Sequence, residues 1–198
     1  MEKFNILYID DSPESGLERY LDTEYSNTEY ETDYSEIQFM PDDGYECLIR
    51  NTKVQVANII FIDSRLFENR TVAAGKFSGE EFKIILKKYY PFIEVIVITQ
   101  NDADKSVGTI SKYDPNCGKT ASAYYAEHLP GYIEKAIDNI LVYRRLAEKL
   151  EINTSWESTL IEKIINSLYG VGTYDELTKT DIDNLISAFR EIQEKIDG

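Results

Sequence analysis

Two short hydrophobic segments that each end in aspartate constrain the fold of this chain more than any other feature. Residues 5–9 lead directly into Asp10 and Asp11, and residues 58–62 lead into Asp63. Because these segments are rich in Ile and apolar at consecutive positions, we interpret them as strands buried on both faces. Such strands are typical of a parallel sheet covered by helices. Ligands bind where the carboxyl ends of such strands meet, so we expect the three aspartates to share one acidic pocket.

The predicted pocket has the electrostatics of a cation site. Two carboxylates about 4 Å apart repel each other by roughly 4 kcal/mol at an effective dielectric constant near 20. A bound cation relieves that repulsion. We therefore expect Asp10, Asp11 and Asp63 to bind one.

Strand and helix patterns alternate over residues 1–150, which predicts an α/β domain with a doubly wound, five-stranded parallel sheet. The other three strands are predicted at residues 37–40, 94–99 and 121–125, the last being short. Helices are predicted between the strands. They begin at Ser12 as N-cap, after Asp42 or Asp43, after Gly79, and at Pro130, the last running toward Leu150.

Residues 151–198 are predicted to form a small helical extension. Residues 154–157 resemble a capping box ahead of one helix, and Thr180 precedes a second helix with a regular apolar stripe. We expect a helical hairpin that packs on itself, on the α/β domain or on a partner.

The charge of the chain argues against two classes of partner. The sequence has 36 acidic and 21 basic residues, a net charge of −15. Binding to nucleic acid or to an anionic membrane requires a surplus of Lys and Arg, so neither is expected. We find no segment long and apolar enough to span a bilayer and no room for a signal peptide before the first strand. Cys47 and Cys117 form no disulfide or metal-binding pattern, and we expect a cytoplasmic protein.

Residues 3–145 resemble the receiver domain of two-component response regulators, the CheY-like family. The resemblance implies a flavodoxin-like fold. It rests on residues at successive strand ends and on one helix start: Ile9-Asp10-Asp11, Phe61-Ile62-Asp63, Ile96-Val97-Ile98-Thr99, Tyr124, and Ser78-Gly79-Glu80-Glu81-Phe82.

The resemblance implies a role for each matching residue. Asp63 would be the phosphoacceptor, a carboxylate nucleophile that forms an aspartyl phosphate. Asp10, Asp11, Asp63 and the backbone carbonyl of Arg65 would bind Mg²⁺, which prefers carboxylate, water and phosphoryl oxygens. Thr99 would supply the hydroxyl that contacts the phosphoryl group, and Tyr124 would be the aromatic switch.

One departure from the family bears directly on the chemistry. Receivers carry a lysine three residues after the aromatic of strand five, and Glu127 occupies that position here. An acid at this place would repel a phosphoryl group. The alternatives are a different register for strand five, or a lysine supplied from another position, Lys119 or Lys105.

The leading expectation is a signalling protein, not an enzyme. It would receive a phosphoryl group from a sensor histidine kinase or phosphotransfer protein and act on a downstream protein target. One rival is a pseudo-receiver, an unphosphorylated binding or dimerisation module, which Glu127 favours. The other rival is a metal-dependent hydrolase. The 3,4 spacing of apolar residues over 133–150 fits a homodimer contact, a signalling helix, or simple packing on the sheet.

Overall fold

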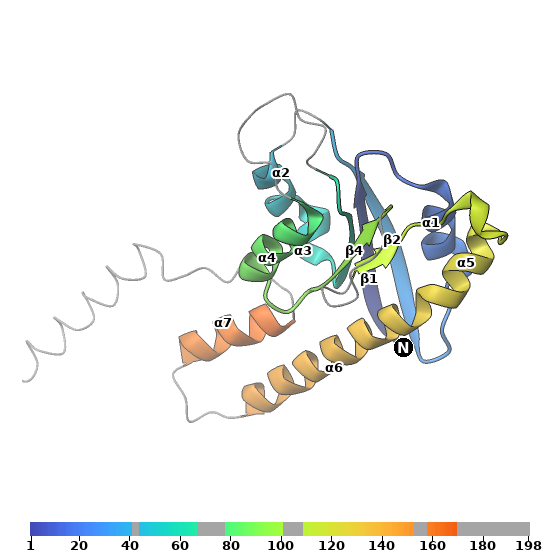
Figure 1. Cartoon of the computed structure of the whole chain (residues 1–198). Coiled ribbons are helices and arrows are strands. Elements are labelled where there is room, and N and C mark those ends of the chain that lie inside the picture. The colour runs from blue at the N-terminus through green and yellow to red at the C-terminus, as the bar shows by residue number, and fades with distance from the viewer. Residues whose placement is uncertain (41–43, 67–77, 101–108, 153–157, 170–198) are drawn as a thin grey trace, which may run out of the picture.

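The structure is a computed structural model, and it describes residues 1–40, 44–66, 78–100, 109–152 and 158–169. Five parallel strands form one sheet in the order β2-β1-β3-β4-β5 (Figure 1). Their bounds are β1 Glu2–Asp10, β2 Tyr30–Gln38, β3 Ile59–Asp63, β4 Glu94–Thr99 and β5 Thr109–Ser111.

This strand order is that of flavodoxin-like proteins, and it confirms the predicted α/β class. From β1 the chain crosses to β2 on one side and then returns to β3 on the other side. The reversal places the switch point of the sheet between β1 and β3, where Ile9 pairs with Ile62. In open parallel sheets this is the point at which ligands bind.

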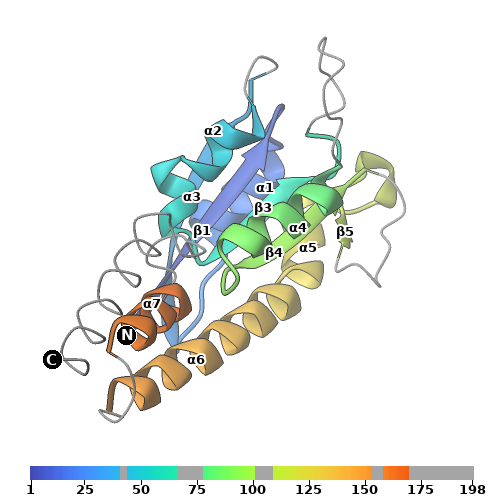
Figure 2. The same ribbon diagram turned by 90° about the vertical axis from the view of Figure 1, so that its left-hand side faces the viewer.

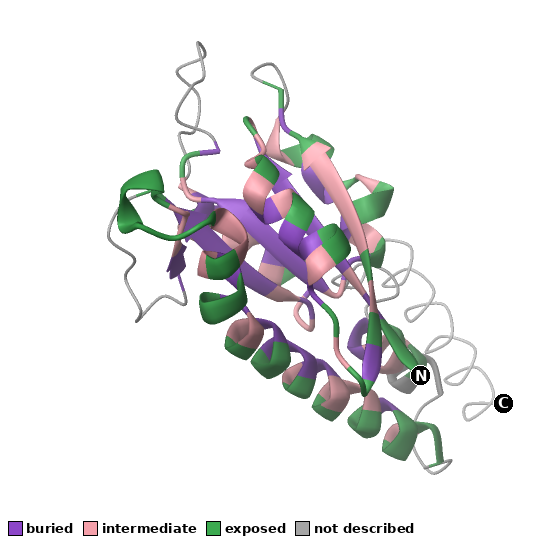
Figure 3. Ribbon diagram, turned by 90° about the vertical axis from the view of Figure 1, so that its right-hand side faces the viewer, coloured by how far each residue is buried: buried purple, intermediate pink, exposed green. Residues whose placement is uncertain are grey.

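Side chains of the central strands β1, β3 and β4 alternate between two hydrophobic cores, one on each face of the sheet. In β1, Phe4, Ile6 and Tyr8 enter one core, whereas Leu7 and Ile9 enter the other. Figure 3 shows the central strands buried and the outward faces of the helices exposed, whereas the edge strand β2 is mostly intermediate or exposed. Both faces of the central strands are therefore covered, which explains why these strands are apolar at consecutive positions.

One group of helices covers each face (Figure 2). The helices α2, α3 and α4 pack on the face of Leu7, and α1, η1, α5 and α6 pack on the face of Tyr8. The bounds on the first side are α2 Tyr45–Ile49, α3 Thr52–Val56 and α4 Gly79–Tyr89. Those on the second side are α1 Ser15–Arg19, the π-helical turn η1 Tyr20–Glu24, α5 Ala121–His128 and α6 Pro130–Ile152.

Three predictions about element positions are wrong in detail. The predicted N-cap of the first helix is Ser12, but that helix begins at Ser15 with Glu14 at the N-cap, and Ser12 lies in the turn where its backbone N–H donates to the Asp10 side chain. Strand β2 begins at Tyr30, earlier than predicted, because pairing with β1 extends it. The segment predicted as the fifth strand, residues 121–125, is helical. The capping residues predicted at 42–43 lie outside the described residues.

Local capping explains the helix at residues 121–128. The Thr120 side chain accepts a hydrogen bond from the backbone N–H of Ala123, as an N-cap does. Gly16 of α1 lies against this helix, so that a methyl group on Gly16 would be 2.6 Å from the Ala121 Cβ. This close contact fixes α5 against α1.

The long helix α6 packs on the sheet with the stripe predicted from its 3,4 spacing. Ile133, Ala136 and Ile140 are buried in the core of the Tyr8 face. Farther along, α6 contacts α7 (Ser158–Leu168). The predicted capping box and the helix after Thr180 lie outside the described residues, so the boundary at residue 150 stays a prediction. Within the described part of the chain, no helix is both long and apolar enough to cross a membrane.

Candidate functional site

The three predicted aspartates do come together at the switch point of the sheet. Asp10 ends β1, and Asp11 directly follows Asp10 in the chain. Asp63 ends the neighbouring strand β3. One carboxylate oxygen from each lies within 4.8 Å of the others. Asp10 is 1% exposed and Asp63 is 5% exposed, whereas Asp11 is partly exposed. The prediction of one shared acidic pocket is confirmed.

A lysine that the sequence analysis did not identify completes this pocket. Lys112 follows β5 directly, and its backbone N–H donates to the Thr99 carbonyl at 2.6 Å. Its Nζ atom lies 2.7 Å from Oδ2 of Asp10 and 2.7 Å from Oδ1 of Asp63. The Lys112 side chain is only 9% exposed. One ammonium group therefore bridges two buried carboxylates.

The structure corrects the predicted register of strand five. Glu127 does not face the pocket; it is an exposed residue of α5 that pairs with Lys119. Lys119 is thereby excluded as the substitute cation, and Lys105 lies outside the described residues. A buried lysine does reach the pocket, Lys112, and it comes from the end of a different segment.

Hydrogen bonds from β1 and the following turn orient the Asp10 carboxylate. The Tyr8 hydroxyl donates to Oδ2 of Asp10 at 2.5 Å, and the Ser12 backbone N–H donates to Oδ1 at 2.9 Å. Tyr8 is fully buried. Burial, together with the neighbouring Asp10 charge, raises the pKa of Tyr8, so this hydroxyl stays protonated and acts as a donor.

The Asp63 carboxylate is oriented by the turn that follows β3. The Arg65 backbone N–H donates to Oδ2 of Asp63 at 2.7 Å. The N-terminus of α4 approaches this turn so closely that a methyl group on Gly79 would lie 2.4 Å from the Asp63 carbonyl oxygen. Only glycine permits that approach. The predicted glycine-led helix therefore packs directly behind the candidate phosphoacceptor.

Burial and charge act in opposite directions on the bridged groups. Burial raises the pKa of Asp63, and pairing with Lys112 opposes that effect. Burial alone would lower the pKa of Lys112, but its bonds to Asp10 and Asp63 outweigh it, and the pKa is raised. The lysine is therefore a firmly held cation at neutral pH.

The other two predicted site residues lie close to Lys112 in the folded protein. Thr99 is the buried last residue of β4 and pairs with Ser111. Tyr124 is in α5, not in a strand, but its hydroxyl donates to the Ser111 carbonyl at 3.0 Å. Both residues thus contact the short segment that positions Lys112.

The donor set suits a hard divalent cation. Three carboxylates meet at one sheet edge, and Mg²⁺ is bound through a few such oxygens plus water. Lys112 bonds to Oδ2 of Asp10 and Oδ1 of Asp63, and the other oxygen of each carboxylate accepts a backbone N–H, from Ser12 and Arg65 respectively. Asp10, Asp11 and Asp63 therefore form a possible metal site.

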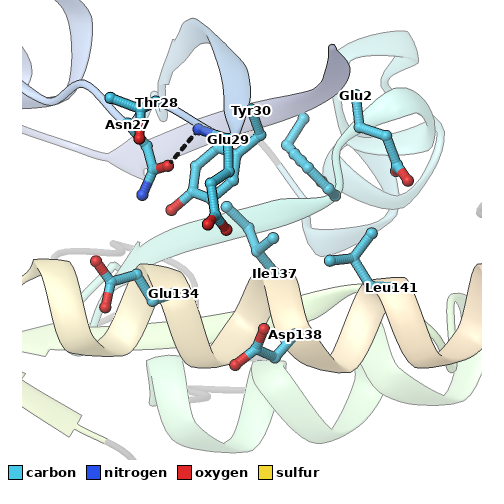
Figure 4. Close-up of a pocket in the computed structure, with 10 residues that line it drawn as sticks. Glu2, Asn27, Thr28, Glu29, Tyr30, Glu134, Ile137, Asp138 and Leu141 are labelled. Carbon is cyan, nitrogen blue, oxygen red and sulfur yellow. Dashed lines mark hydrogen bonds between the residues drawn. The ribbon is translucent and has the colours of Figure 1, made fainter.

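A second pocket, of about 520 Å³, lies at the opposite, amino-terminal ends of the strands (Figure 4). Buried Phe4 lines it, and the Arg144 guanidinium lies over the Phe4 ring at 4.5 Å while pairing with Glu2. Four lining residues carry carboxylates, and no cation is among the described residues of this lining: Glu2, Phe4, Asn27, Thr28, Glu29, Tyr30, Glu134, Ile137, Asp138, Leu141. This lining would repel a phosphoryl group.

Comparison with protein-family models finds no match for the chain, and comparison with curated proteins finds none either. The likeness to receivers therefore rests on the fold and on the site. The flavodoxin-like strand order, the acidic cluster at the switch point and the buried lysine together resemble a receiver phosphorylation site.

Proposed function

We propose that this chain is a response-regulator-type signalling protein that accepts a phosphoryl group on Asp63 in the presence of Mg²⁺. The bridge from Lys112 to Asp63 and Asp10 is the observation that supports the proposal most strongly. A buried ammonium beside a strand-end carboxylate provides the positive charge that an incoming phosphoryl group requires.

The proposed reaction transfers the phosphoryl group from a donor to a carboxylate. An Asp63 oxygen attacks phosphorus, and the bond between phosphorus and the donor breaks. The leaving group, a histidine imidazole or acetate, keeps the electron pair of that bond. The product is a mixed carboxylic–phosphoric anhydride. Bound Mg²⁺, held by Asp10, Asp11, Asp63 and the Arg65 carbonyl, would neutralise charge on the phosphoryl oxygens.

Lys112 has two consequences for this reaction. Its ammonium would form a charge-assisted hydrogen bond to a phosphoryl oxygen. The ammonium has three N–H donors, of which Asp10 and Asp63 now engage two. A shift of Lys112 toward the phosphoryl oxygen would loosen one of these bonds and so would link phosphorylation to a rearrangement of the β5 end. Thr99, at the end of the adjacent strand, would supply the hydroxyl contact to the phosphoryl group.

The alternative of an unphosphorylated pseudo-receiver loses its main support. That alternative depended on Glu127 standing in the pocket, and Glu127 instead pairs with Lys119 on the surface. A difference from the resembled family persists, because Thr109 and not an aromatic residue lies three positions before Lys112. A wild-type protein that neither accepts a phosphoryl group nor binds beryllium fluoride would be a pseudo-receiver.

The proposed partners follow from this reaction and from charge. A sensor histidine kinase or phosphotransfer protein would supply the phosphoryl group, and a protein target would read the result. A nucleic acid is not proposed as a target because the net charge is −15.

The test is phosphorylation with a small donor. The protein is incubated with Mg²⁺ and acetyl phosphate, and intact mass spectrometry looks for one phosphoryl adduct. We expect the adduct in the wild type and not in Asp63→Asn, and we expect Mg²⁺-dependent binding of beryllium fluoride. Asp114→Asn, in an exposed turn, is the matched control and should be modified normally. Absence of both the adduct and beryllium fluoride binding in the wild type would refute the proposal.

A further inference from the structure

Two consecutive tyrosines of α5 hold the backbone on both sides of Lys112. The Tyr124 hydroxyl donates to the carbonyl of Ser111 at 3.0 Å. The backbone N–H of Tyr113 donates to the Tyr125 hydroxyl, also at 3.0 Å. The residue before Lys112 and the residue after it are therefore both fixed to the same helix. We call Tyr124 and Tyr125 the tyrosine clamp.

The clamp is itself rigidly supported. Tyr125 is fully buried and donates its own hydroxyl hydrogen to Oε2 of Glu14 at 2.6 Å. Tyr124 packs its ring against Tyr113, with 5.8 Å between the centroids, and stacks on His128 at 4.3 Å. Each hydroxyl therefore has a defined position, set by ring packing as well as by its hydrogen bonds.

The residue that supports Tyr125, Glu14, is also connected to Asp10 in the acidic pocket. The backbone N–H of Glu14 donates to the Tyr8 hydroxyl at 3.3 Å, and that hydroxyl donates to Asp10. A continuous series of contacts thus runs from Asp10 through Tyr8, Glu14 and Tyr125 to the end of β5. The ion pair of Lys112 with Asp10 closes this series. Displacement of any member changes the geometry available to Lys112.

The brevity of β5 makes such support necessary. The strand has three residues, Thr109–Ser111, and within the described sheet it pairs with β4 alone. Lys112 lies just beyond its end, where its backbone N–H still bonds to the Thr99 carbonyl. Without further contacts the ammonium of a long, flexible side chain would not be confined between two carboxylates.

We propose that Tyr124 and Tyr125 are positioning residues that fix Lys112 between Asp10 and Asp63, and through which a change at Lys112 reaches helix α5. The second part rests on the proposed function, since it assumes that a phosphoryl group draws Lys112 from its present bonds. The first part does not depend on it. The position three residues before the lysine holds Thr109, so this chain would use aromatic residues of a helix in place of a strand aromatic.

The test removes the two hydroxyls and keeps the rings. Tyr124→Phe/Tyr125→Phe is compared with the wild type, and Tyr143→Phe is the matched control. Tyr143 also donates a hydroxyl hydrogen bond, to Glu94 at 3.1 Å, but from α6 and away from Lys112. Thermal unfolding confirms that each variant folds, and single Tyr124→Phe replaces the double variant if the latter does not.

The first readout is the ammonium of Lys112 itself, in protein with ¹⁵N-labelled lysine. Its Nζ protons should exchange slowly with water in the wild type and in Tyr143→Phe, and at least about fivefold faster in the double variant, because a bridge released from its support opens more often. A role in folding alone would not change this rate selectively. An exchange rate unchanged in the double variant overturns the proposal.

The second readout is the affinity for beryllium fluoride with Mg²⁺. We expect the double variant to bind about five- to tenfold more weakly, and Tyr143→Phe to bind as the wild type does. Faster exchange with unchanged affinity would leave the clamp as the support of Lys112 but would overturn the second part of the proposal, because the position of Lys112 would then not matter to the phosphoryl site. If the wild type itself binds no beryllium fluoride, the proposed function fails, and the exchange rate alone decides whether the clamp positions Lys112.

Discussion

The ammonium group of Lys112 lies 2.7 Å from Oδ1 of Asp63, and its equally short contact with Asp10 joins the ends of three strands at one point. The two carboxylates are almost fully buried, so the positive charge of Lys112 must compensate the cost of removing their negative charges from water. The same bridge therefore bears on stability and on the proposed chemistry.

Lys112→Met should destabilise the protein strongly. It leaves two buried carboxylates without their counterion, and breaking a buried ion pair on one side costs about 3–5 kcal/mol. The free energy of unfolding in urea measures this. Lys119→Met removes an exposed partner of Glu127 and should cause no measurable change. An equal loss of unfolding free energy in both variants would show that the bridge from Lys112 to Asp10 and Asp63 contributes no more to stability than an exposed ion pair.

The stability that Lys112 provides should disappear at high pH. Because its pKa is raised above 10.5, the folded state holds this proton more tightly than the unfolded chain does. The contribution is then fully present below pH 10.5 and is lost as the pH rises through the folded-state pKa. The difference in unfolding free energy between the wild type and Lys112→Met should therefore shrink above pH 10.5. A difference that stays constant with pH would contradict the prediction.

Gly79→Ala should disturb the site and the fold together. Its methyl group would lie 2.4 Å from the Asp63 carbonyl oxygen, and the backbone atoms there cannot easily move. Overpacking of this kind costs about 1–3 kcal/mol. Gly131→Ala is the matched control in α6, where nothing lies within 4 Å, and it should be neutral or stabilising by up to about 1 kcal/mol. Urea unfolding of both variants checks the contrast, which would fail if the two behaved alike.

Mg²⁺ should raise the unfolding temperature, and the effect should depend on Asp11. A ligand that binds only the folded state stabilises it by about 2.7 kcal/mol at a concentration 100 times its Kd. Asp11→Asn removes the partly exposed carboxylate of the cluster and should lose most of the shift. Glu127→Gln, on the surface of α5, should retain it. An equal shift in Asp11→Asn would exclude this residue as a ligand.

Glu127→Lys should leave the site unchanged. Were this residue at the end of strand five, the substitution would restore a missing cation and strengthen binding of a phosphoryl analogue. Because Glu127 is exposed on α5 and pairs with Lys119, we expect the affinity for beryllium fluoride with Mg²⁺ to stay within about twofold of the wild type. Markedly tighter binding would mean that α5 approaches the pocket in solution.

Much of the fold and half of the site could be predicted from local sequence signals. The strands before Asp10 and Asp63 are apolar because both of their faces are buried, and this leaves a strong pattern. The glycine-led α4 also follows a local signal, the capping box of Ser78 and Glu81. Adjacency of the strand ends then follows from parallel topology. The sequence alone therefore determined the acidic half of the pocket.

The tertiary structure alone decided where the lysine comes from. Three residues of β5 are too few to show a periodicity, and they form a strand only because Val97–Thr99 of β4 offers its edge. Residues 121–125, rich in Ala and Tyr, fit a short strand equally well in sequence, but the Thr120 cap and close packing against Gly16 make them a helix. Pairing and packing between distant segments, not local preference, thus placed Lys112 in the pocket and Glu127 on the surface.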